Sequence, residues 1–164
     1  MEMIKFLMKY DKLLLGSIML IPWLTLPFMD KRSFKRYFPS ALFICVVVFI
    51  ESIVAHKQKW WLFYKKLIPK TLGELPLIAG PFFVGTLWIM KFTFGHFVRY
   101  FSLNLFIDII FSMIMTDWLR SLGLASLIRI KKYQFLFIFL IKATILYLFQ
   151  FFWSNKTDKK LFRK

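Results

Sequence analysis

The sequence has few of the residue types on which catalysis and metal binding usually depend. One cysteine, Cys45, and two histidines, His56 and His96, occur among its 164 residues. A lone cysteine cannot form a disulfide within the chain, and neither histidine belongs to a metal-binding motif. An HExxH zinc motif, a GxSxG nucleophile elbow and a phosphate-binding glycine loop are also missing. We therefore expect no catalytic residues, no metal and no cofactor, and we favour a protein that is not an enzyme.

Acidic residues are scarce as well, with 8 Asp and Glu against 24 Lys and Arg and a net charge of +16. On a soluble protein this excess would suggest a nucleic-acid partner. Here the basic residues lie mostly between apolar runs, at positions 31–36, 57–70, 129–132 and 156–164. Basic residues beside membrane spans attract anionic lipid headgroups, each by on the order of 1 kcal/mol. We expect a bilayer with anionic headgroups as the partner, and no nucleic acid.

Apolar residues are abundant in the sequence. The chain is 59% hydrophobic and contains 22 phenylalanines. A soluble protein of this length has too much surface to bury so many large apolar groups, and the length suits one compact unit. We therefore expect a single membrane domain over residues 1–164. Lysine outnumbers arginine, and alanine and glycine are scarce, which is typical of a low-GC bacterial genome and points to a bacterial plasma membrane.

Five apolar stretches are candidates for membrane spans, because a helix needs about 20 mostly apolar residues to cross the hydrocarbon core. They are residues 13–29, 38–55, 75–90, 97–115 and 133–153. The first is short, and Pro22 and Pro27 would break its helical hydrogen bonds. No signal-cleavage site follows it, so we expect it to be retained. The sequence predicts an all-α integral membrane bundle of five transmembrane helices, or four if residues 13–29 do not cross, with short basic loops.

Two further features refine these helices. Gly80, Pro81 and Gly85 predict a kink or close packing in the third span, since small residues let backbones approach. The positive-inside rule leaves the orientation open: basic residues divide almost evenly between the two sides for five spans, whereas four spans would favour both termini in the cytoplasm.

Tryptophans mark the ends of the spans, where amphipathic rings prefer the headgroup boundary. As interfacial anchors we identify Trp60, Trp61, Trp88, Trp118 and Trp153. Two connecting segments, residues 56–70 and 121–132, combine basic side chains with aromatic or aliphatic ones. We expect both to lie along the membrane interface as amphipathic segments.

Charged residues inside the spans are the strongest candidates for function. Glu51, Asp108 and Lys142 each lie in an apolar stretch, where a central charge costs roughly 2.5–3.5 kcal/mol and therefore usually finds a partner inside the bundle. We expect a buried pair of Asp108 and Lys142, oriented by Asn104. Glu51 is an alternative partner of Lys142, or it binds water or Arg99 near an interface. Asn104, Asp108 and Ser112 recur every four residues and so share one helix face. These five residues form the predicted intramembrane polar cluster.

Three functions are compatible with this cluster. In the first, which we favour, the charges stabilise the bundle or an interface with another membrane protein. In the second, Glu51, Asp108 and Lys142 form a small carrier or a pathway for ions or protons. In the third, two carboxylates converge near the headgroups of a lipid-modifying enzyme. A water-accessible cavity reaching Asp108 and Lys142 would favour transport, whereas a dry pair would favour the structural role.

Several short motifs resemble a family of small, uncharacterised multi-pass membrane proteins of spore-forming Gram-positive bacteria. The similarity extends from about residue 22 to 150 and rests on KRSFKRYF at 31–38, Glu51–Ser52, KWWLFY at 59–64, GELP at 73–76, GPFFVG at 80–85, residues 88–91 and ASLIRIKKYQ at 125–134. The resemblance implies a bacterial source and a membrane location, and it implies no activity.

Overall fold

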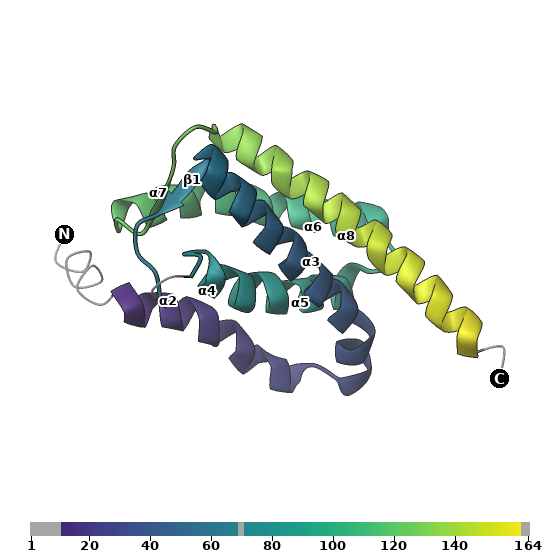
Figure 1. The fold of residues 1–164 in the computed structure, drawn as a ribbon. Helices are drawn as coiled ribbons and strands as arrows, with labels where there is room; N and C mark the ends of the chain where they lie inside the picture. The colour runs from purple at the N-terminus through teal and green to yellow at the C-terminus, as the bar shows by residue number, and fades with distance from the viewer. Residues whose placement is uncertain (1–10, 69–70, 162–164) are drawn as a thin grey trace.

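The computed structural model describes residues 11–68 and 71–161, with the side chains of residues 12–68 and 71–155. The structure is 80% helical and its described part contains five helical rods. In chain order they are α2 (Asp11–Leu20) with the 3₁₀ helix η1 (Ile21–Phe28); α3 (Lys31–Gln58); α4 (Leu75–Leu77) with the π-helix η2 (Ile78–Phe82) and α5 (Phe83–Thr93); α6 (Phe97–Ile109) with the π-helix η3 (Ile110–Met115) and α7 (Thr116–Ser121); and α8 (Lys132–Leu161). Successive rods run in opposite directions (Figure 1).

Four of the rods are long and apolar enough to cross a membrane. They cover Lys31–Gln58, Leu75–Thr93, Phe97–Ser121 and Lys132–Asn155, and they contain the four predicted spans that begin at residues 38, 75, 97 and 133. Those four helices are confirmed. The remaining apolar helix, Lys12–Phe28, is shorter.

The first rod changes its helical type at its prolines. The α-helix ends at Leu20, and the 3₁₀ helix that follows has Pro22 in its first turn and Pro27 inside it. Proline cannot donate a backbone hydrogen bond, and its ring displaces the carbonyl four residues earlier. The expected interruption of α-helical bonding is thus confirmed, although the rod continues as the tighter 3₁₀ form.

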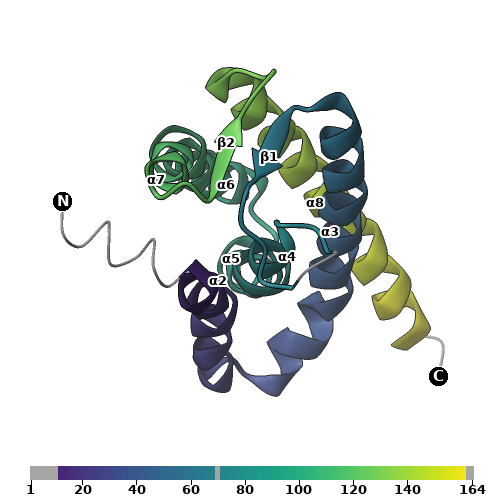
Figure 2. The same cartoon turned by 60° about the vertical axis from the view of Figure 1, so that its left-hand side comes forward.

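The rod from Leu75 to Thr93 lies at the centre of the bundle, where Figure 2 shows α5 almost end-on among the other helices. Half of the most apolar 18-residue stretch of this rod is buried inside the bundle, compared with 22% of the corresponding stretch of Phe97–Ser121. Gly80 lies directly against the backbone of α2: a Cβ atom there would come within 2.7 Å of the Ile18 carbonyl oxygen. Close packing at Gly80 is therefore confirmed. At Gly85 a Cβ atom would meet nothing within 4 Å, so packing does not require that glycine.

Pro81 accounts for the π-helical turn in the same rod. Its ring cannot accommodate the carbonyl of Leu77, and the helix widens over Ile78–Phe82. The Phe83 amide then bonds to the carbonyls of Ile78 and Gly80. The carbonyl of Ala79 instead accepts a hydrogen bond from the indole N–H of Trp23 at 2.8 Å.

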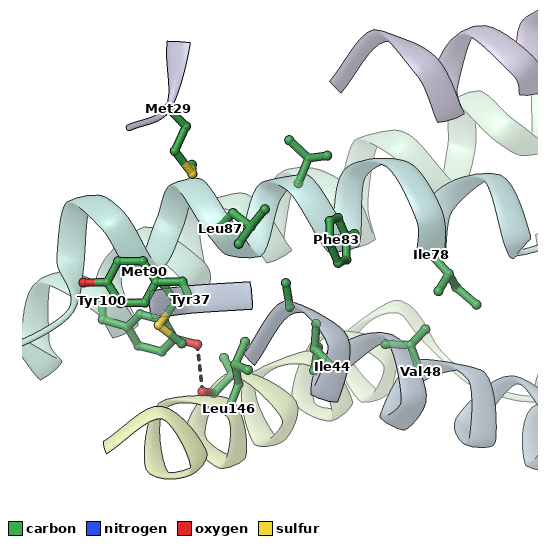
Figure 3. Packing of buried hydrophobic residues seen from close by; sticks show 13 residues of the cluster. Met29, Tyr37, Ile44, Val48, Ile78, Phe83, Leu87, Met90, Tyr100 and Leu146 are labelled. Atoms are coloured by element: carbon green, nitrogen blue, oxygen red, sulfur yellow. Dashed lines mark hydrogen bonds between the residues drawn. The ribbon is translucent and has the colours of Figure 1, made fainter. Parts of the chain in front are cut away.

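The main core fills the space between α3, α5 and α8. Its buried members are Met29, Tyr37, Ala41, Ile44, Val48, Ile78, Phe83, Val84, Leu87, Met90, Tyr100, Ala143 and Leu146, most of which are labelled in Figure 3. The Tyr100 hydroxyl donates to the carbonyl of Ala143 at 2.9 Å and so ties α6 to α8 (Figure 3). A second tie joins α3 to α8, where the Ser40 hydroxyl donates to Gln150 at 2.5 Å.

The two loops expected at the interface pair with each other. Strand β1 (Trp61–Phe63) and strand β2 (Ala125–Leu127) form an antiparallel ribbon with Leu62 opposite Ser126, seen beside α7 in Figure 2. The all-α prediction is right for the rods and missed this ribbon. Two three-residue strands are too short for alternation of apolar and polar residues to reveal them.

Candidate functional site

Lys142 and Glu51 form an ion pair in the middle of the bundle. Lys142 Nζ lies 2.6 Å from Glu51 Oε2, and the side chains are only 9% and 12% exposed. The ammonium also lies 3.9 Å from the centre of the Phe139 ring and 5.6 Å from that of Phe82. These distances are typical of cation–π contacts. The positive charge of Lys142 is therefore held by one carboxylate and two aromatic rings.

The predicted pair of Asp108 and Lys142 is wrong, because the lysine binds the alternative partner. Asp108 and Lys142 are not joined by an ion pair among the described residues, and Asp108 Oδ2 is buried without a hydrogen-bond partner. Asn104 does not orient Asp108 either, since its side-chain amide donates to the Tyr100 carbonyl of its own helix at 2.8 Å. Adjacent α3 and α8 bring Glu51 against Lys142 and leave Asp108 without an ion pair within the described residues.

Two pockets meet at Lys142. The ribbon pocket, about 60 Å³ in volume, extends from Lys142 to β1 and β2 and includes Glu51. The mid-span pocket, about 320 Å³, lies between α5, α6 and α8 and includes Asp108 and Asn104. The side chains that line both pockets are Phe82, Phe111, Phe139 and Lys142. One lysine and three aromatic rings thus form a shared wall, with Glu51 in the pocket on one side of it and Asp108 in the pocket on the other.

The polar face of α6 and η3 is buried along its length. Asn104 is 9% exposed, Asp108 8% and Ser112 0%. Asn104 and Asp108 line the mid-span pocket, whereas Ser112 lines neither pocket and its hydroxyl donates to the Ile109 carbonyl at 3.4 Å. The structure therefore divides the predicted cluster. Lys142 is part of the shared wall, and Glu51 and Asp108 lie in the pockets on its two sides. Asn104 lines the mid-span pocket, and Ser112 lines neither pocket.

Sequence analysis missed a further buried carboxylate, Glu74. It is 5% exposed and lines the ribbon pocket. The indole N–H of Trp61 donates to Glu74 Oε1 at 2.7 Å, and His56 Nδ1 lies 3.7 Å from the same oxygen. Glu74 directly precedes the third predicted span, and a charged residue at this position normally indicates the boundary of a span rather than the interior of the bundle.

Several polar atoms in the ribbon pocket have no hydrogen-bond partner. Glu51 Oε1, Ser52 Oγ and Glu74 Oε2 are all buried without a hydrogen-bond partner, and all three side chains line this pocket. Burying such atoms unpaired is costly, so sites of this kind often receive water or a ligand. Within the described residues there is no group of three or more His, Cys, Asp or Glu side chains that could hold a metal ion.

The tryptophans predicted as anchors have different surroundings. Trp61 is 7% exposed and packs against Phe135 in the core beneath the ribbon, so its role is internal. Trp88 donates to the Thr25 hydroxyl at 2.9 Å and also lines the mid-span pocket. Trp118 and Trp153 are exposed, and Trp60 is half-buried.

Comparisons with models of known protein families, with curated proteins and with solved structures found no match.

Proposed function

We propose that the four long rods cross a bacterial plasma membrane and that the protein is a small carrier for a monovalent cation. Support for the membrane location comes from the outer surface, which presents large apolar side chains to the surroundings: Val98 is 77% exposed, Phe106 63% and Phe137 64%. Such a surface suits lipid and would be costly in water. Basic residues at both ends suit anionic headgroups.

One observation carries the carrier proposal: the mid-span pocket reaches a buried carboxylate, Asp108, that forms no ion pair within the described residues, because Lys142 in the same pocket binds Glu51. Glu51 and Lys142 neutralise each other, whereas Asp108 Oδ2 faces no hydrogen-bond donor. An ionisable group within a membrane span is expensive and usually marks an ion or substrate pathway. A cation that binds at Asp108 would compensate that charge.

Lys142 supplies a means of moving the cation. In the observed arrangement the lysine binds Glu51, and Asp108 is available in the mid-span pocket. If the lysine turned to Asp108, it would displace a cation there and leave Glu51 available in the ribbon pocket. The two carboxylates would thus take the cation alternately, with the shared aromatic wall separating the two pockets. Beyond Glu51, the ribbon pocket continues to Glu74, whose Oε1 lies 3.7 Å from His56 Nδ1 near the end of α3.

The test is charge movement by reconstituted protein on a solid-supported membrane. We expect concentration jumps of protons, sodium, potassium or phenethylammonium to give transient currents for at least one cation, above those of empty liposomes. Asp108→Asn should abolish them. Asp117→Asn is the matched control, because Asp117 lies on the same rod but binds Lys132 at 2.5 Å outside both pockets. Folded wild-type protein that gives no current, or Asp108→Asn protein that keeps it, would overturn the proposal.

The close contact between Lys142 and Glu51 also favours a second candidate, a purely structural role. A buried pair at 2.6 Å can fix the register of two helices or an interface with another membrane protein. In that case no cation would produce an Asp108-dependent current.

A further inference from the structure

The composition of the mid-span pocket narrows the class of cation that it can hold. Its volume of about 320 Å³ is at the lower end of the range for small-molecule sites, roughly 300–1,000 Å³. The side-chain oxygens that line it belong to Thr86, Asn104 and Asp108. Calcium takes six to eight oxygen ligands and magnesium needs near-octahedral geometry. The pocket is too large and too poor in oxygen for either metal.

The remaining lining is aromatic and aliphatic. Phe82, Phe111, Phe139 and Trp88 contribute rings, and Ile44, Ile89, Ile107 and Leu146 contribute aliphatic side chains. Aromatic faces attract organic ammonium groups. The molecule itself contains an example, since the ammonium of Lys142 lies 3.9 Å from the Phe139 ring centre. The rings of Trp88 and Phe111, with which Lys142 forms no cation–π contact, offer such faces to a bound ammonium group.

The charge balance of the pocket requires a ligand with one positive charge. Lys142 also lines this pocket, but its charge is compensated by Glu51 at 2.6 Å. Asp108 remains, 8% exposed and with Oδ2 unpartnered. A buried carboxylate within apolar walls selects a monocation, because an anion would be repelled by it and a neutral alcohol would leave its charge uncompensated.

We infer that the mid-span pocket binds a small protonated amine with an apolar body. The ammonium group binds Asp108, and the apolar part lies against the aromatic and aliphatic walls. The inference rests on the proposed function only in requiring that solutes reach this pocket; binding can be measured without transport.

Gly85 is a position from which a side chain can enter the pocket. It lines the pocket, and a Cβ atom at this position would meet nothing within 4 Å. A leucine there would occupy the space of the ligand. Gly16 provides the matched control, since a Cβ atom there also meets nothing within 4 Å and the residue lines neither pocket.

The experiment is saturation binding of radiolabelled phenethylammonium to the full-length protein in lipid nanodiscs. We expect saturable binding that 2-phenylethanol and phenylacetate do not displace. Asp108→Asn and Gly85→Leu should each weaken affinity about 10-fold or more, which corresponds to at least about 1.4 kcal/mol, whereas Gly16→Leu should leave affinity unchanged.

Three results would overturn the inference: no saturable binding to folded wild-type protein, equal displacement by phenylacetate, or undiminished binding to the Asp108→Asn variant. Currents with sodium or protons in a protein that does not bind phenethylammonium would refute the amine site and leave the carrier proposal standing. Amine binding without currents for any cation would refute the carrier and leave the site.

Discussion

The pairing of Lys142 with Glu51 rather than Asp108 predicts an order of stabilities among three single variants. Lys142→Met would leave Glu51, with a side chain only 12% exposed, as an uncompensated buried charge. Breaking a buried pair in this way costs about 3–5 kcal/mol. Glu51→Gln should cost much less, because the amide oxygen still accepts a hydrogen bond from Lys142 and Asp108 lines the same pocket as the lysine.

The smaller losses can be estimated from the hydrogen bonds. Replacing a charged acceptor by a neutral one should cost about 1 kcal/mol in Glu51→Gln. Asp108→Asn removes a carboxylate whose Oδ2 has no hydrogen-bond partner, so we expect the free energy of unfolding to stay the same or to rise as a buried charge is removed. The expected order of destabilisation is therefore Lys142→Met, then Glu51→Gln, then Asp108→Asn.

Equilibrium unfolding in mixed detergent micelles, followed by circular dichroism, measures the free energy of unfolding of each variant. The double variant Glu51→Gln/Lys142→Met should recover part of the loss caused by Lys142→Met, because neither charge remains. Asp108→Asn that destabilises more than Glu51→Gln would refute this reasoning. It would mean that the lysine binds Asp108 in the membrane.

The remaining predictions concern packing and pH. Gly80→Ala should destabilise the protein by about 1–3 kcal/mol, because overpacking against α2 forces backbone shifts, whereas Gly85→Ala should stabilise it by about 0.5–1 kcal/mol through helix propensity; equal effects in the same unfolding assay would contradict the close approach at Gly80. Lys91 at 2.9 Å and the Ser33 amide at 2.8 Å hold the pKa of the Asp30 carboxyl well below its usual range. The carboxylate therefore contributes stability above the ordinary pKa of an aspartate, and this contribution is lost as the pH falls through the lowered pKa. Asp30→Ala should lower the melting temperature at neutral pH and have less effect in strong acid. An equal decrease in melting temperature at the two pH values would argue against the ion pair of Asp30 and Lys91.

The helices could be predicted from the sequence because their signal is local. Four long apolar runs bounded by basic residues give helices at the predicted places, and the prolines at 22 and 27 mark the change of helical type. The membership of Glu51, Asp108 and Lys142 in the interior followed from the cost of exposing charge to lipid.

The choice of partner could not be predicted, because it depends on how the rods are rotated against one another. Lys142 has carboxylates on two neighbouring rods, and a rotation by one residue, about 100°, changes which of them it meets. The same limit applies to Glu74, whose burial is created by Trp61 in a loop thirteen residues earlier. The ribbon adds contacts between loops that are more than sixty residues apart in the sequence.

The claim at the centre of this account is that the mid-span pocket is open to cations from water. The most direct test is the labelling rate of a cysteine placed at Gly85 in a Cys45→Ala background, compared for a trimethylammonium and a sulfonate methanethiosulfonate reagent. We predict faster labelling by the cationic reagent, loss of that preference in Asp108→Asn, and no labelling of a control cysteine at Phe137, which faces outward at 64% exposure. A thiol at Gly85 that reacts with neither reagent, or with both at equal rates, would contradict the claim.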